Sequence, residues 1–208
     1  MSIDNPYAPP SANVESTRQH KGAQPTSDAL VYGGFWRRFG AFWVDAICLL
    51  PLAGINYLLS QQFRLSNLYW LLPGLLIGVW FHVYLVVRYG GTPGKLLLKT
   101  RITMLDGSAV TSRAALLRHA VTFALTLLTS AALAMAANHM TDEAYFSLGY
   151  IARSQALVSY APAWYKWLAL AMQAWILSEF IVMMLNKRRR ALQDFMAGTV
   201  VIRVGVDD

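Results

Sequence analysis

The sequence is poor in charged residues and nearly free of cysteine. Only 14% of its 208 residues are charged, whereas 56% are hydrophobic. Soluble domains carry charge on about a quarter of their residues, so this composition excludes an ordinary soluble protein. The one cysteine, Cys48, excludes an intrachain disulfide, and its place in an apolar run favours a packing role over a reactive thiol.

Motifs for catalysis, metal binding and nucleotide binding are also missing. The segment "GGTPGK" at 90–95 is one residue short of the phosphate-loop pattern, and Leu96 stands where Ser or Thr is required. The histidines form neither an HExxH motif nor a Cys/His cluster (His20, His82, His119 and His139). We therefore expect no metal, no cofactor and no enzymatic activity. The net charge of +7 could suit nucleic acid, but the basic residues flank apolar runs, so we expect no nucleic-acid partner.

The sequence has instead four apolar runs of membrane length. These runs cover residues 38–59, 68–87, 116–137 and 164–185. About 20 apolar residues cross a bilayer as a helix, and Trp and Tyr gather at the ends of these runs as in an interfacial belt. The prediction is an all-α membrane protein in the lipid bilayer, with a four-helix membrane domain over 33–204. Residues 1–32 lack an apolar signal-peptide stretch and are rich in Pro, Ser, Asn and Gln, which predicts a disordered cytoplasmic tail and an uncleaved first span.

The basic residues predict how the chain is oriented. If the N-terminus is inside, 15 of the 18 Lys and Arg residues fall in inner segments, and only Arg64, Arg153 and Lys166 fall outside. By the positive-inside rule, both termini should be cytoplasmic and residues 138–163 should form an outer loop.

The inner loop between the second and third runs predicts a small cytoplasmic β element. "LLLKTRITML" followed by "DGSAVT" is typical of a β-hairpin turning at Asp106-Gly107, with an interfacial helix over 93–100 as the alternative. Thr111 or Ser112 can cap the third helix. After the fourth run, "KRRRALQDFMAG" favours a short amphipathic helix, and "TVVIRV" is a strand that could pair with the hairpin.

Ionisable residues inside the apolar runs predict a site. Arg38 and Asp45 are seven residues apart and share a helix face. Small and polar residues continue this face toward neighbouring helices, and large apolar residues are expected to turn elsewhere, toward lipid (Ala41, Cys48 and Asn56; Trp43, Ile47 and Leu50). Asp45 and Glu179 lie about equally deep from the inner ends of their helices, and His82 is six residues from its own inner end. These three residues are therefore expected to share one layer as a candidate ion or proton site.

Asp45 needs a partner, because a carboxylate in the bilayer core costs about 2.5 kcal/mol or more. Arg118 and Arg38 are the predicted charge partners, with His82 as a further neutralising group. Asp194 is expected to take the other arginine at the membrane surface. Two interpretations stay open at this point. Asp45 only fixes the positions of the helices that pack around it, or it marks a path for ions or protons.

Three blocks of this sequence resemble the RDD family, named for one Arg and two Asp. "FWRRFGAFWVDAI" resembles its first-span motif with Arg38 and Asp45, and "GGTPGKLLLKTRITMLDG" with "ALLRHAV" resembles its inner loop and the next helix. "RRRALQDFMAGTVVI" resembles its closing motif, with Asp194 as the second Asp. The resemblance implies a multi-pass protein of the bacterial inner membrane. It also implies transport of an unidentified ligand, with cation/proton exchange suggested for some members.

Two functions are therefore carried forward. One is transport of a small ligand such as a monovalent cation in exchange for protons, by a homo-oligomer, because four helices form a thin wall around any path. The other is a non-catalytic membrane scaffold or regulator that binds protein partners or anionic lipid through its basic inner surface.

Overall fold

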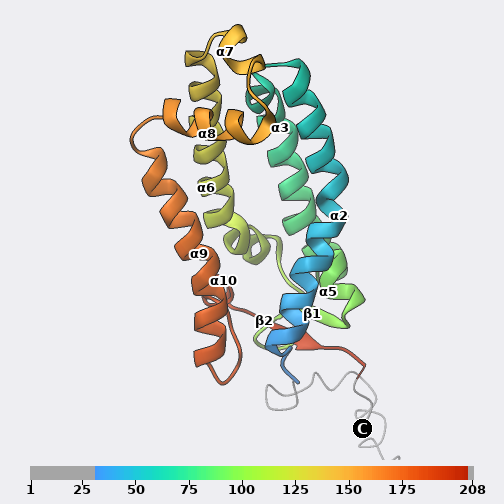
Figure 1. Cartoon of the computed structure of the whole chain (residues 1–208). Helices are drawn as coiled ribbons and strands as arrows, with labels where there is room; N and C mark the ends of the chain where they lie inside the picture. The colour runs from blue at the N-terminus through green and yellow to red at the C-terminus, as the bar shows by residue number, and fades with distance from the viewer. Residues whose placement is uncertain (1–30, 206–208) are drawn as a thin grey trace, which may run out of the picture.

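The computed structural model describes residues 31–205, and four long apolar helical segments dominate it (Figure 1). The first is α2 (Phe35–Gln62). The second is continuous through α3 (Ser66–Val79), the π-helical turn η2 (Trp80–Tyr84) and α4 (Leu85–Tyr89). The third and fourth are α6 (Ser112–His139) and α9 (Tyr165–Leu185). Each is long and apolar enough to cross a bilayer, so the structure has the four membrane-length helices that the sequence predicted. The predicted disordered tail falls almost wholly on residues 1–30, outside the described part.

Local sequence signals explain where these helices run and where they begin or end. Pro51 and Pro73 lie inside α2 and α3, which is tolerated in membrane helices because neighbouring groups satisfy the freed carbonyls. Thr111 caps α6, as predicted, by accepting a hydrogen bond from the backbone N–H of Ala114 at 3.2 Å. Gly90 ends α4 with φ +81°, a left-handed conformation that glycine adopts freely.

The outward face of α2 is apolar, as expected for a helix that faces lipid. Trp43, Ile47 and Leu50 are each more than half exposed, which agrees with the face predicted for them. Ala41 and Asp45 are the buried residues of this helix. Cys48 was expected beside them on the inward face, but its side chain is exposed.

At one end of the bundle lies a small two-stranded antiparallel sheet, and the predicted hairpin is wrong. Strand β1 (Thr100–Met104) pairs with β2 (Thr199–Arg203) near the end of the described chain, not with the segment that follows it. The turn around Gly107 does form, because Met104 N–H donates to the Ser108 carbonyl at 2.9 Å. No strand follows it, because α6 begins at Ser112 and leaves too few residues.

Two short helices complete this end of the molecule. Helix α5 (Pro93–Leu97) covers the first part of residues 93–100, for which a helix was the predicted alternative to the hairpin. Helix α10 (Leu192–Ala197) follows the fourth span, where the short amphipathic helix was predicted. The chain at 31–33 runs along the other edge of β2, since Gly33 N–H donates to the Val201 carbonyl at 2.9 Å.

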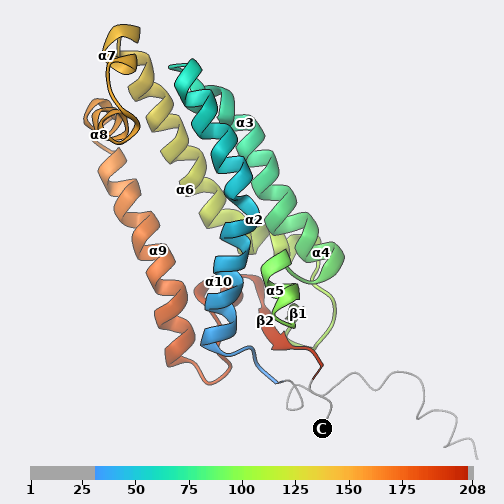
Figure 2. The ribbon, with the colours of Figure 1, turned by 45° about the vertical axis from the view of Figure 1, so that its right-hand side comes forward.

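The opposite end holds α7 (Asp142–Phe146) and α8 (Tyr150–Tyr160), both within the predicted outer loop (Figure 2). The buried Arg153 fastens them together. Its guanidinium donates to the carbonyls of Tyr145, Ser60 and Leu148 at 2.9–3.0 Å and lies 4.5 Å from the centre of the Tyr145 ring.

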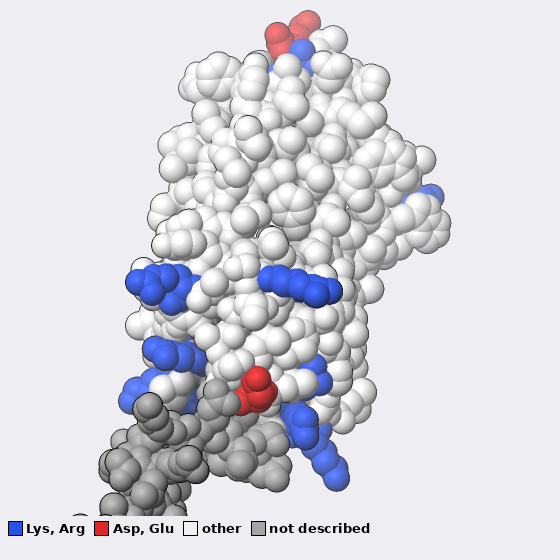
Figure 3. Space-filling model, turned by 180° about the vertical axis from the view of Figure 1, so that it is seen from behind, with Lys and Arg blue, Asp and Glu red and all other residues white. Residues whose placement is uncertain are grey.

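Charged side chains are distributed unevenly along the long axis of the molecule. On the face seen in Figure 3, most blue side chains gather toward the end with the sheet, and a broad band above them is almost without charge. Both ends of the described chain lie at the sheet end (Figure 1). This pattern fits a chain that crosses a bilayer several times, with the sheet and both ends on the same side.

Candidate functional site

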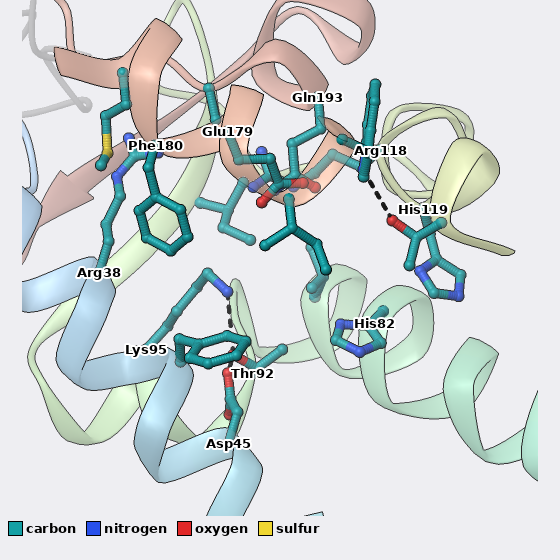
Figure 4. Close-up of a pocket in the computed structure, with 18 of the residues that line it drawn as sticks. Arg38, Asp45, His82, Thr92, Lys95, Arg118, His119, Glu179, Phe180 and Gln193 are labelled. Atoms are coloured by element: carbon teal, nitrogen blue, oxygen red, sulfur yellow. Dashed lines mark hydrogen bonds between the residues drawn. The ribbon is translucent and has the colours of Figure 1, made fainter. Parts of the chain in front are cut away.

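A cavity of about 400 Å³ lies between the spans near the sheet end. Side chains from α2, η2, α5, α6 and α9 line it (Figure 4). Arg38, Asp45, His82, Arg118 and Glu179 are all in the lining. The structure therefore brings together the three candidate ion-site residues and the two predicted charge partners. Asp194 lies behind them, paired with both arginines.

Asp194 is the centre of a buried ion-pair network. It is fully buried and lies between Arg38, whose Nη1 is 2.9 Å from Oδ2, and Arg118, which pairs with Oδ1. The backbone N–H of Ala191 also donates to Oδ2 at 2.9 Å, and Thr199 Oγ1 lies 3.3 Å from Oδ1. Burial alone would raise the pKa of the Asp194 carboxyl, but the charges of Arg118 and Arg38 and these hydrogen bonds lower its pKa to about 2.

The predicted pairing of Asp45 with Arg38 or Arg118 does not form in the structure. Both arginines bind Asp194, which was expected to take only one of them and is fully buried. Asp45 accepts hydrogen bonds from Thr92 Oγ1 at 2.6 Å and from the Gly94 N–H at 2.7 Å. These neutral donors stabilise the buried carboxylate and fasten the start of α5 to the middle of α2.

Gly94 makes this contact possible because it has no side chain. A Cβ there would lie 2.9 Å from Asp45 Oδ1 and would overlap the backbone of α2 at Ala41. The segment "GGTPGK" thus turns the chain from α4 into α5, and its Thr92 and Gly94 supply the hydrogen bonds to Asp45. Sequence reasoning missed this role, because the turn lies about 50 residues from Asp45.

Lys95 is a further cavity residue that sequence reasoning missed. Its Nζ donates to Thr92 Oγ1 at 3.3 Å, and the same hydroxyl donates to Asp45 (Figure 4). A basic group is thereby linked to Asp45 through one hydroxyl. The only signal in the sequence was a lysine in the inner loop, eight residues after the end of the second apolar run.

Glu179 is the acidic group of the cavity that has no fixed partner. Its half-buried side chain lies in the lining from α9 and makes no hydrogen bond or ion pair with any residue from 31 to 205. Arg38 also keeps two buried nitrogens, Nε and Nη2, without a hydrogen-bond acceptor. The polar groups of the cavity are therefore only partly satisfied by the protein itself.

Two histidines stack against each other in the cavity wall formed by η2 and α6. The rings of His82 and His119 are 4.9 Å apart between centroids and 19° from parallel. His82 lies in the π-helical turn η2, a rare distortion that often accompanies functional sites. His119, the neighbour of Arg118 in sequence, was not among the predicted site residues.

The charges of this layer are balanced in number. Arg38, Lys95 and Arg118 are basic, and Asp45, Glu179 and Asp194 are acidic. Asp194 binds two arginines and Asp45 is linked to Lys95, so Glu179 is the one member free to change its proton or its partner.

Comparison with known proteins agrees with the sequence blocks that carry these residues. The sequence model described as the RDD family matches residues 32–198, which include Arg38, Asp45 and Asp194. Neither a curated protein nor a solved structure matches the chain. The matched segment covers all four spans and most of the sheet end, and on this ground the chain belongs to the RDD family, a family of integral membrane proteins.

Proposed function

We propose that this chain transports a small ligand across the membrane in a proton-linked reaction, by exchanging a monovalent cation for a proton at Glu179. The observation that carries the proposal is an acidic side chain without a partner in a cavity between membrane-spanning helices. Ionisable groups at such depth are costly and commonly mark ion or proton pathways.

The exchange has a simple chemical basis. With a proton on Glu179, the carboxyl is neutral, and a monovalent cation that displaces this proton leaves the net charge of the cavity unchanged. The carboxylate oxygens of Glu179 and Asp45 supply ligands for the cation, and the imidazoles of His82 and His119 accept and pass on the released proton. Arg38 and Asp194 hold the surrounding helices in place.

The proposal includes orientation and assembly. The end with the sheet faces the cytoplasm of a bacterial cell, with both termini inside, because most basic residues gather there. The protein works as a homo-oligomer, because α9 closes one side of the cavity as a single helix.

The test is cation-dependent proton movement by the full chain in liposomes. Sodium, lithium or potassium added against a pH gradient should release protons with wild-type protein. Glu179→Gln should abolish this release while the variant still inserts and migrates as a folded species in detergent. Glu143→Gln removes an exposed acid of α7, far from the cavity, and should behave as wild type.

A negative result would be equally informative. If wild-type protein releases no protons with any of these cations between pH 6 and 9, the exchanger proposal is wrong. Retained release in Glu179→Gln would remove Glu179 from the reaction.

A further inference from the structure

A second cavity at the sheet end is lined by basic residues. It has a volume of about 760 Å³ and lies between the end of α4, α5, β1 and the residues after β2. Arg88, Lys99 and Arg101 line it, and all three side chains are exposed. Within the described part of the chain, its lining contains no acidic residue.

These three cations have no acidic partner in the described structure. The ion pairs of residues 31–205 involve Arg38, Arg64 and Arg118 only. The Arg88 guanidinium lies 5.9 Å from the centre of the Tyr89 ring, a contact that leaves its N–H groups available. Three basic groups around one hollow, without an acidic partner among residues 31–205, produce a positive potential that favours an anionic group.

The backbone at Lys99 is a second, independent sign of a binding role. Lys99 has φ +52°, in the left-handed region, where a residue with a side chain is strained and glycine is not. The conformation is held by hydrogen bonds from Lys99 N–H to the Leu96 carbonyl and from Val204 N–H to the Lys99 carbonyl, at 3.0 and 2.9 Å. A lysine in this position costs stability that glycine would avoid, which indicates that its side chain is needed.

The surroundings of the cavity indicate where the anion comes from. Val86, Val87 and Leu96 form apolar walls at the end of the second candidate span. Nearby, Tyr84 and Leu97 are exposed, by 52% and 69%. A phospholipid offers both a phosphate for the basic residues and acyl chains for the apolar walls.

We propose that Arg88, Lys99 and Arg101 form a binding site for the headgroup of an anionic phospholipid. A lipid with net negative charge is favoured over a zwitterionic one, because a choline group would bring a fourth cation to the site. The site shares Val86 and Ile102 with the wall of the Glu179 cavity, but its three basic residues do not line that cavity, and the proposal does not depend on transport.

The experiment uses the full purified chain in non-ionic detergent and counts bound lipids by native mass spectrometry. Phosphatidylglycerol should bind more tightly than phosphatidylcholine. Lys99→Gly and Arg101→Gln should each weaken phosphatidylglycerol binding about fivefold, the effect of about one basic contact at a membrane surface. Arg113→Gln is the matched control, because Arg113 is an exposed basic residue at the start of α6 that does not line this cavity.

Lys99→Gly separates binding from folding. The glycine relieves the left-handed strain, so thermal stability should be unchanged or higher while lipid binding falls. Equal losses in Lys99→Gly and Arg113→Gln would refute the site, because they would indicate a general effect of charge. Equal binding of the two lipids would also overturn the proposal. Displacement of phosphatidylglycerol by glycerol phosphate at equal concentration would show that the site takes free phosphate and not lipid.

Discussion

Asp194→Asn is expected to destabilise the protein strongly, because it leaves two buried arginines facing a neutral amide. Arg38 and Arg118 are 9% and 6% exposed, so water cannot replace the lost charge. Breaking a buried ion pair by removal of one partner costs about 3–5 kcal/mol. The substitution also replaces one acceptor oxygen by an NH₂ group, which can only donate. Either the Ala191 N–H or one arginine therefore loses its hydrogen-bond acceptor.

The pH dependence gives a second measure of the same network. The pKa of Asp194 is about 2 in the folded protein and near 3.9 in an unfolded chain. The difference corresponds to about 2–3 kcal/mol of stability from ionisation alone. This contribution is fully present above pH 4 and is lost as the pH falls from about 4 to 2, because the unfolded chain takes up the proton first. It is smaller than the cost of Asp194→Asn, because the substitution also removes hydrogen bonds.

Thermal unfolding in detergent, followed by tryptophan fluorescence, is the assay. The melting temperature of Asp194→Asn should fall well below that of wild type at pH 7, and the gap should narrow as the pH approaches 2. Asp142→Asn is the control, because Asp142 is exposed by 74% and pairs with Arg64 at the surface, where such a pair contributes about 1 kcal/mol at most. If Asp194→Asn and Asp142→Asn melt alike, the buried network does not hold the sheet end together, and the reasoning fails.

Two further predictions follow from the packing of α5 and from the orientation. Gly94→Ala should destabilise the protein by about 1–3 kcal/mol, because the added Cβ overlaps α2 and Asp45. Gly54→Ala is the control and should not destabilise it, because the space around Gly54 is open. A lower melting temperature for Gly54→Ala than for Gly94→Ala would contradict this contact. A cysteine at Ser147, in a Cys48→Ser background, should react with an impermeant thiol reagent in intact cells, and labelling only after permeabilisation would show that α7 and α8 face the cytoplasm.

The sequence by itself determined the membrane architecture. Runs of about 20 apolar residues can satisfy their backbone groups in lipid only as helices, so hydropathy alone predicts the four spans. The same patterns indicated that Asp45, Glu179 and His82 lie at similar depth, because depth depends only on the count of residues from the end of a helix. The outward face of α2 was predictable for the same reason.

Only the tertiary structure decided which groups meet. The sequence indicated that the closing strand "TVVIRV" could pair with the inner loop, and β2 does pair with β1, almost 100 positions away. It was wrong about the second strand of a local hairpin, because the turn at Asp106-Gly107 is visible in sequence, whereas the absence of a strand after it is not. Asp194 follows the last span in sequence, yet the fold buries it between arginines of α2 and α6. With both arginines committed there, Asp45 takes the Thr92 hydroxyl and the Gly94 N–H instead. A charge in a low-dielectric interior requires a hydrogen-bonding or charged partner, and this requirement can be predicted from the sequence. The identity of the partner depends on which helices pack together.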